Sequence, residues 1–146
     1  MVESHLSNKS EENIEASELL ISKNLYASSV HCSYYATFQH LTCKWSHYSR
    51  LTFKEVTNKS KGADSHNYLI DEIIGFIKAR ELGCETDVIQ KNVKETNIHR
   101  LRRNIFDLKS FRKKSDYLDI CIDKTISEKS LNFSKNIIRK INNYMP

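Results

Sequence analysis

The chain contains very little proline and glycine, the residues that most often interrupt helices. Its only proline is Pro146, the last of 146 residues, and it has three glycines. Proline breaks a helix because it lacks a backbone donor and clashes with the preceding turn. Nothing in the body of the chain therefore forces a helix to end, and long helices are permitted almost everywhere.

Long apolar runs and closely spaced cysteines are also missing. No apolar stretch approaches the ~20 residues of a membrane span, and the first twenty residues are polar and acidic, unlike a signal peptide. We therefore expect a soluble cytoplasmic protein that does not contact membranes. Without a Cys-x-x-Cys pair, a zinc ribbon or a dense disulfide scaffold is not expected, and we expect reduced, mostly buried thiols. The four cysteines are Cys32, Cys43, Cys84 and Cys121.

The charge balance is mildly basic. Lys and Arg together number 23 against 18 Asp and Glu, which gives a formal net charge of +5. Such a bias can serve a polyanionic partner, although ordinary surface charge accounts for it as well. The chain has no Gly-rich phosphate loop, no G-x-S-x-G and no H-E-x-x-H, so the usual phosphoryl-transfer and hydrolase sites are not expected.

Apolar residues at spacings of three and four predict an all-α fold. After a polar lead-in at residues 1–10, we expect one domain at residues 11–146, an antiparallel up-and-down bundle of about five helices joined by short connections. The first helix is expected at residues 11–23, with Ala16, Leu19 and Leu20 facing inward. The second is the central helix, and its apolar stripe comprises Val30, Tyr34, Thr37, Phe38, Leu41, Trp45 and Tyr48.

Residues 54–62 are polar and are expected to form a loop. A third helix follows, with Asp64 or Ser65 as its cap, and ends near Gly83. A fourth begins between Thr86 and Thr96, and a fifth opens at Thr125-x-x-Glu128, which has the form of a capping box. The expected inward residues are Leu69, Ile70, Ile73, Ile74 and Ile77 of the third helix, Ile98, Leu101, Ile105 and Leu108 of the fourth, and Ile126, Phe133, Ile137 and Ile141 of the fifth.

Arg112 is the most informative single residue. The heptad-like alternation that ends at Leu108 extends to Arg112 and Ser115, so the guanidinium is expected at the bundle seam or at a partner surface. An unpaired buried charge is too costly to persist. Either Arg112 pairs with Asp116 along the helix, for roughly a few tenths of a kcal/mol, or it is held ready for a phosphate.

Basic residues are concentrated around Arg112. Within residues 99–114 acidic neighbours are scarce, and such a density of cations can neutralise several phosphates of a nucleic acid. The alternative is a solvated helix face. The candidate nucleic-acid-binding residues are Arg100, Arg102, Arg103, Lys109, Lys113 and Lys114, together with Arg112.

Histidines give weaker signals. His40, Cys43 and His47 stand at i, i+3 and i+7, a spacing that can present three metal ligands, but no matching pair occurs elsewhere and we expect no metal site. His66 is isolated near the start of the third helix, where a capping or surface role is the simpler interpretation.

Residues 17–38 resemble the opening helical pair of HEPN domains, with Ser33 ahead of the aromatic pair and alanine at residues 34–36. Farther on, Ser65 and His66 precede an apolar helix, and residues 112–117, RKKSDY, resemble the R-x-x-x-D-Y signature of small stand-alone HEPN proteins. The resemblance spans roughly residues 15–143. It implies a helical bundle that usually dimerises, with the arginine motif of each protomer near the shared interface, and a role in RNA cleavage or in RNA or nucleotide binding.

The resemblance also implies a setting, because many relatives work beside a nucleotidyltransferase or antitoxin partner in defence and toxin-antitoxin systems. One departure matters. The ribonuclease members carry a histidine four to six residues after the arginine, whereas no histidine follows His99 here. Metal-independent cleavage has thus lost its obvious acid-base group.

We therefore expect a homodimer without cofactors that binds RNA or a nucleotide through a basic surface centred on Arg112. The first alternative is a ribonuclease toxin that uses Arg112 with Asp116, Tyr117 or His66, the last only if the fold brings His66 across to Arg112. The second alternative is a catalytically silent module that completes a complex with a partner protein.

Overall fold

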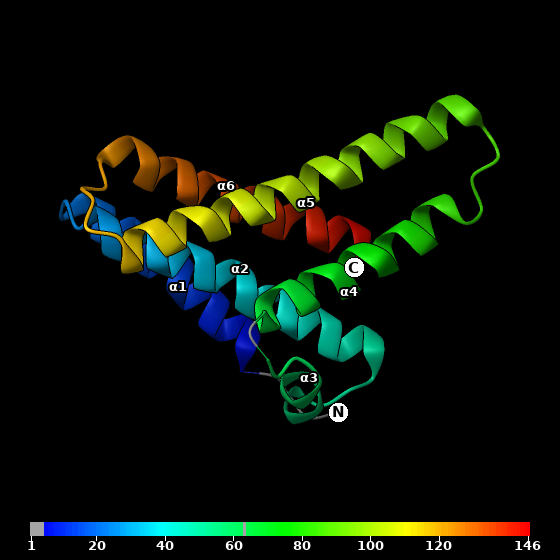
Figure 1. Ribbon diagram of the computed structural model, residues 1–146, viewed down its shortest axis with the longest axis horizontal. Coiled ribbons are helices and arrows are strands. Elements are labelled where there is room, and N and C mark those ends of the chain that lie inside the picture. Colours follow the sequence, from blue (N-terminus) through cyan, green and yellow to red (C-terminus); the bar gives the residue numbers. More distant parts are fainter. Residues whose placement is uncertain (1–4, 63) are drawn as a thin grey trace.

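Periodic apolar residues and the scarcity of proline produce a chain that is helical over nearly its whole length. The computed structural model describes residues 5–62 and 64–146, and this part forms an all-α bundle without strands (Figure 1). The helices are α1 (Leu6–Ser22), α2 (Tyr26–Ser49), α3 (Phe53–Lys59), α4 (Ser65–Leu82), α5 (Val88–Tyr117) and α6 (Lys124–Tyr144).

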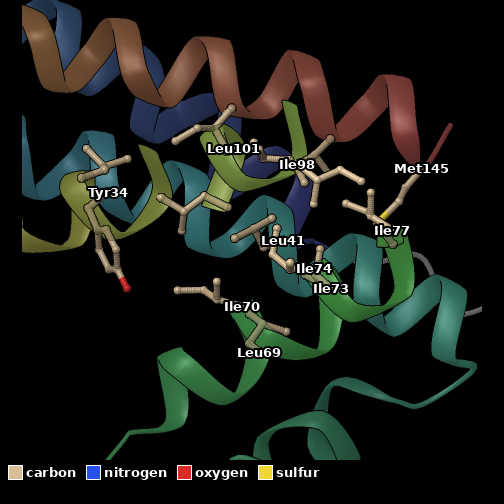
Figure 2. Close-up of a cluster of buried hydrophobic side chains, with 14 of the residues drawn as sticks. Tyr34, Leu41, Leu69, Ile70, Ile73, Ile74, Ile77, Ile98, Leu101 and Met145 are labelled. Atoms are coloured by element: carbon tan, nitrogen blue, oxygen red, sulfur yellow. The ribbon is translucent and has the colours of Figure 1, made fainter. Parts of the chain in front are cut away.

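Helix α2 is the central helix, as its stripe of apolar residues predicts. It packs against each of the other five helices. Figure 2 shows aliphatic side chains of α4 and α5 gathered beside Leu41 of α2, with Tyr34 at one edge of the cluster. The buried faces predicted for the third and fourth helices are confirmed in full, since all nine of their aliphatic residues are buried in α4 and α5.

Residues 53–59 form helix α3, so the loop that the polar stretch predicts at residues 54–62 is wrong for most of its length. Thr52 caps this helix: its side chain accepts from the backbone N–H of Glu55, and the Glu55 carboxylate accepts from the backbone N–H of Thr52. This reciprocal arrangement is a capping box. The T-x-x-E pattern therefore marks a capping box at residues 52–55, and not at residues 125–128.

The expected capping box at Thr125 and Glu128 is wrong, because α6 begins one residue before Thr125. Asp123 is the N-cap, and its carboxylate accepts from the backbone N–H of Ile126. Asp64 occupies the N-cap position of α4 but forms no side-chain capping bond. Of the expected inward residues of α6, Ile137 and Ile141 are buried, and Phe133 is partly buried against the core.

Helix α1 begins at Leu6, five residues earlier than expected, and its inward face is polar. Leu19, expected inward, is 61% exposed. Serines take its place: Ser17 bonds to the hydroxyls of Ser29 and Ser33, each at 2.7 Å, and Ser10 donates to the carbonyl of Ala36 at 2.7 Å. Small hydrogen-bonded side chains thus join α1 to α2.

Helices α4 and α5 extend beyond the bundle where residues 83–87 join them, at the upper right of Figure 1. Among the described residues, no helix is long and apolar enough to cross a membrane. All four cysteines are free, but Cys32 and Cys43 are only partly buried and Cys84 and Cys121 are exposed, so the expectation that the thiols are mostly buried is wrong.

Candidate functional site

Arg112 lies on the face of α5 that meets α2 and is only 6% exposed. Its guanidinium carbon lies 5.0 Å from the ring centroid of Tyr34, 5.7 Å from that of Tyr35 and 5.5 Å from that of Tyr117. A cation over aromatic faces is stabilised electrostatically, and more so when it is removed from water. The burial predicted from the register of α5 is therefore confirmed, and three tyrosines surround the charge.

Not every N–H group of the Arg112 guanidinium has a hydrogen-bond partner among the described residues. Nη1 donates to the Tyr117 hydroxyl at 3.1 Å and lies 3.7 Å from Oδ2 of Asp116. Nε is buried and has no hydrogen-bond partner within the described part of the chain. A buried donor without a partner costs about 1–3 kcal/mol. Since arginine offers five N–H groups, the side chain retains capacity for a further acceptor.

His31 reaches the same cluster from α2, although it is 85 residues from Asp116. Its Nδ1 lies 2.9 Å from Oδ2 of Asp116, and its ring lies 4.6 Å from that of Tyr35. The side chain of His31 is half exposed. Asp116 thus lies between the buried Arg112 and an accessible imidazole. Sequence reasoning missed His31, because no local pattern links it to Asp116.

The fold brings His66 to the same group of residues. Nδ1 of His66 lies 2.5 Å from the hydroxyl of Tyr34, and its ring stacks on Phe38 at 4.0 Å. Burial, followed by the charges of Arg112, Lys109 and Lys113, lowers the pKa of His66 to about 4. Burial also raises the pKa of Tyr34. His66 is therefore neutral at pH 7, and Tyr34 keeps its proton and can donate it to Nδ1.

Lys109 is buried between α5 and the start of α4. Its Nζ donates to Oδ1 of Asn67 at 2.5 Å and to Oδ1 of Asp64 at 3.4 Å. Burial, and then the neighbouring charge of Lys113, lowers the pKa of Lys109. Lys109 thus fastens α5 to α4 on the same side of the molecule as His66.

The remaining basic candidates occupy two faces of α5. At 3.6 residues per turn, Arg102 and Lys113 lie on the side of Lys109, and Arg102 pairs with Asp71 at 3.1 Å. The exposed Arg100, Arg103 and Lys114 lie roughly a third to a half of a turn around the helix from Arg112. The candidates therefore form no single surface. Lys109 and Lys113 lie near the face of α5 that carries Arg112, whereas the outward Arg100, Arg103 and Lys114 do not.

His40, Cys43 and His47 lie elsewhere, along a cavity of about 1060 Å³ beside α1 and α6. Nε2 of His40 lies 2.9 Å from Oδ1 of Asn142, and burial lowers the pKa of His40. Among the described residues, no group of three His, Cys, Asp or Glu side chains is placed to hold a metal ion.

Comparison of the chain with protein-family models, with curated proteins and with solved structures gave no match. An arginine with unused donors, two lysines, several aromatic rings and an accessible imidazole suit a ligand that combines phosphate with aromatic groups.

Proposed function

We propose that the chain is a HEPN-like antiparallel bundle that binds RNA or a nucleotide at the surface around Arg112. The observation that carries this proposal is the Arg112 cluster, which we define as His31, Tyr34, Tyr35, His66, Lys109, Arg112, Lys113, Asp116 and Tyr117. It combines a cation that has unused donors with aromatic faces and two further lysines.

The chemistry of arginine supports a phosphate as the acceptor. Its planar guanidinium can donate two parallel hydrogen bonds to a phosphate, and such charge-assisted bonds are roughly twice as strong as neutral ones. Binding that rests on phosphate contacts weakens with salt, because counterions are released from the nucleic acid. In this proposal the protein is a cytoplasmic homodimer that works beside a nucleotidyltransferase or antitoxin partner in a toxin-antitoxin or defence system.

The test is binding of a labelled single-stranded RNA at 50 and 200 mM salt by wild type and three variants. We expect Arg112→Lys, which keeps the charge but loses the guanidinium, to weaken binding about tenfold. Lys113→Ala should weaken it less and reduce the salt slope by about one. Arg103→Ala, on the outward face, is the matched control and should bind nearly as wild type does.

Unchanged affinity in a folded Arg112→Lys variant would refute the proposal. Equal losses in Lys113→Ala and Arg103→Ala would instead indicate non-specific attraction by the whole basic helix.

A second candidate, a metal-independent ribonuclease, is favoured by the pairing of His31 with Asp116. An imidazole oriented by a carboxylate through Nδ1 leaves Nε2 for proton transfer. In this scheme Nε2 of His31 removes the proton of a ribose 2′-hydroxyl, and the 2′-oxygen attacks the adjacent phosphorus. The bond to the 5′-oxygen breaks, the Tyr117 hydroxyl protonates that oxygen, and a 2′,3′-cyclic phosphate remains. Arg112 stabilises the charge that develops on the phosphate.

Cleavage of RNA in the presence of a chelator tests this candidate. His31→Ala should lower the cleavage rate by about 10²- to 10⁴-fold, the usual contribution of a general acid or base, while RNA binding persists. His99→Ala removes an exposed histidine from the outward part of α5 and serves as the control. Cleavage that survives in His31→Ala would exclude this role, and binding without any cleavage would leave the protein a binding module.

A further inference from the structure

A second, smaller cavity adjoins the Arg112 cluster. Its volume is about 330 Å³, and α2, α3 and α4 contribute to its walls. The apolar part is formed by Phe38, Val56 and Leu69, and His66 forms part of the wall as well. His66 therefore belongs to both places: its Nδ1 faces the Tyr34 hydroxyl of the cluster, and its ring lines the cavity.

Helix α3 forms one wall of this cavity. Val56 is the buried residue of this seven-residue helix, so α3 is anchored by one side chain and by its capping box. Phe53, at the start of α3, also lines the cavity and is 56% exposed. A large aromatic side chain left partly in water beside a cavity is a surface on which a flat ligand can stack.

The walls combine aromatic faces with polar groups. Phe38 and His66 stack on each other with ring centroids 4.0 Å apart and an angle of 25° between planes. Ser60, Ser65 and Lys61 supply hydroxyl and ammonium groups at the same cavity. A nucleobase has this same character, since its two faces are apolar and its edges carry hydrogen-bond donors and acceptors. A volume near the lower end of the range for small-molecule pockets suits one base with its ribose.

A chain of short contacts connects the cavity to Arg112. The ring of His66 lies 5.6 Å from that of Tyr34, and the Arg112 guanidinium lies 5.0 Å from the Tyr34 ring. Lys109 joins the first turn of α4, which carries His66, to α5. A base in the cavity and a phosphate at the cluster would thus both lie beside His66, which lines the cavity and contacts Tyr34.

We propose that this cavity is the base-binding subsite for a nucleotide or an RNA residue whose phosphate contacts the Arg112 cluster. The proposal rests on the proposed function for the phosphate and adds the group that gives selectivity. Because every base has an aromatic face, stacking alone gives affinity, and the hydroxyls and Lys61 of the lining add a preference among bases.

The experiment titrates adenosine 5′-monophosphate, adenosine and inorganic phosphate separately into the ¹⁵N-labelled protein and follows amide shifts. Phe53→Ala removes a stacking surface and should weaken adenosine monophosphate and adenosine about tenfold. Thr57→Phe places a ring in the cavity and should abolish the binding of both. Leu19→Ala truncates a similarly exposed apolar residue on α1 and should change nothing. Inorganic phosphate should bind wild type, Phe53→Ala and Thr57→Phe alike.

The outcomes separate the two proposals. Adenosine that binds the folded Phe53→Ala and Thr57→Phe variants as tightly as wild type would overturn the base subsite, as would a wild type that binds neither adenosine nor its monophosphate. If phosphate and RNA fail to bind but adenosine binds and Thr57→Phe abolishes it, the proposed function fails and the subsite remains. If phosphate and RNA bind and the cavity variants change neither RNA nor adenosine monophosphate affinity, the base subsite fails and the proposed function remains.

Discussion

At the N-terminal end of α5, Val88 and Ile89 are 72% and 73% exposed, whereas Lys109 and Arg112 near its C-terminal end are each 6% exposed. In most proteins aliphatic side chains are buried and lysine and arginine stay in water. Both ends of α5 depart from this rule, in opposite directions. The comparison shows that burial in this helix depends on what packs beside each turn more than on the character of each side chain.

The neighbours of each end explain the difference. The first turns of α5 extend beyond α2, and Lys94 pairs with Glu85 at 2.7 Å in this exposed region. The later turns lie against α2, where Arg112 meets tyrosine rings, and against the start of α4, where Lys109 meets Asn67. A protein that keeps two cations buried must satisfy them with many contacts. Departures of this kind are expected mainly at functional sites.

Of changes at the two buried cations, Arg112→Ala is expected to have the larger effect on stability. The change removes a buried charge, leaves the Tyr117 hydroxyl and Asp116 without this partner, and opens a space among three tyrosine rings. We expect the free energy of unfolding to fall by about 3 kcal/mol. Urea denaturation measures this value, with Arg103→Ala, an exposed arginine of the same helix, as a control that changes it by less than about 0.5 kcal/mol. Equal, small effects would mean that burial of Arg112 contributes nothing to the fold.

Lys109→Ala should have the next largest effect. It removes the hydrogen bonds to Asn67 and Asp64 and leaves the Asn67 carbonyl oxygen without this donor, which costs about 1–2 kcal/mol. Lys113→Ala, one turn later and exposed, is the matched control and should be nearly neutral. If both variants unfold at the same urea concentration, the contact between α5 and the start of α4 is not held by Lys109.

Lowering the pH is expected to reduce the free energy of unfolding by a smaller amount. The pKa of His66 is about 4 in the folded protein, against an ordinary value of 6.5. The unfolded chain therefore binds more protons between these values, so the stability supplied by His66 is complete above pH 6.5 and is lost as the pH falls to about 4. His66 is partly exposed, so we expect a loss of only about 1 kcal/mol.

Unfolding of wild type and His66→Phe at pH 4.5 and 7 isolates this contribution. The phenylalanine can still stack on Phe38 but cannot titrate, so the difference between the two pH values should shrink. His99→Gln removes an exposed histidine and should leave the difference unchanged. An equal pH difference in His66→Phe and wild type would show that other groups cause it.

Local sequence patterns predicted the middle of α5 and the site residue on it. Ile98, Leu101 and Ile105 recur at helical spacing and are buried, and the same register predicts the burial of Arg112. Periodicity works here because aliphatic residues reveal which face is buried. It could not predict the partners of Arg112, since Tyr34 and His31 lie on α2, far away in sequence, and their approach depends on tertiary packing.

The interface between α1 and α2 shows the opposite case. Ser17 and Ser33 are buried there and Leu19 is exposed, so apolar periodicity placed Leu19 on the wrong face of α1. Small hydroxyl residues suit close helix contacts as long as they bond to each other, but a serine in a sequence looks the same in a core and in water. Helix α3 was missed for a related reason, because it has a single buried residue and its capping box lies in a polar stretch.

The smallest effect is expected where apolar side chains are exposed. Ile89→Ser at the N-terminal end of α5 removes little buried surface, so the free energy of unfolding should change by less than about 0.5 kcal/mol. Ile105→Ser, on the same helix but buried, should lower it by several kcal/mol because it removes a core side chain and buries a hydroxyl. Urea denaturation at two protein concentrations compares them. A clear loss of stability in Ile89→Ser, larger at high protein concentration, would mean that another copy of the chain covers this end of α5. The burial of the two ends of α5 would then differ less than it does in the single chain.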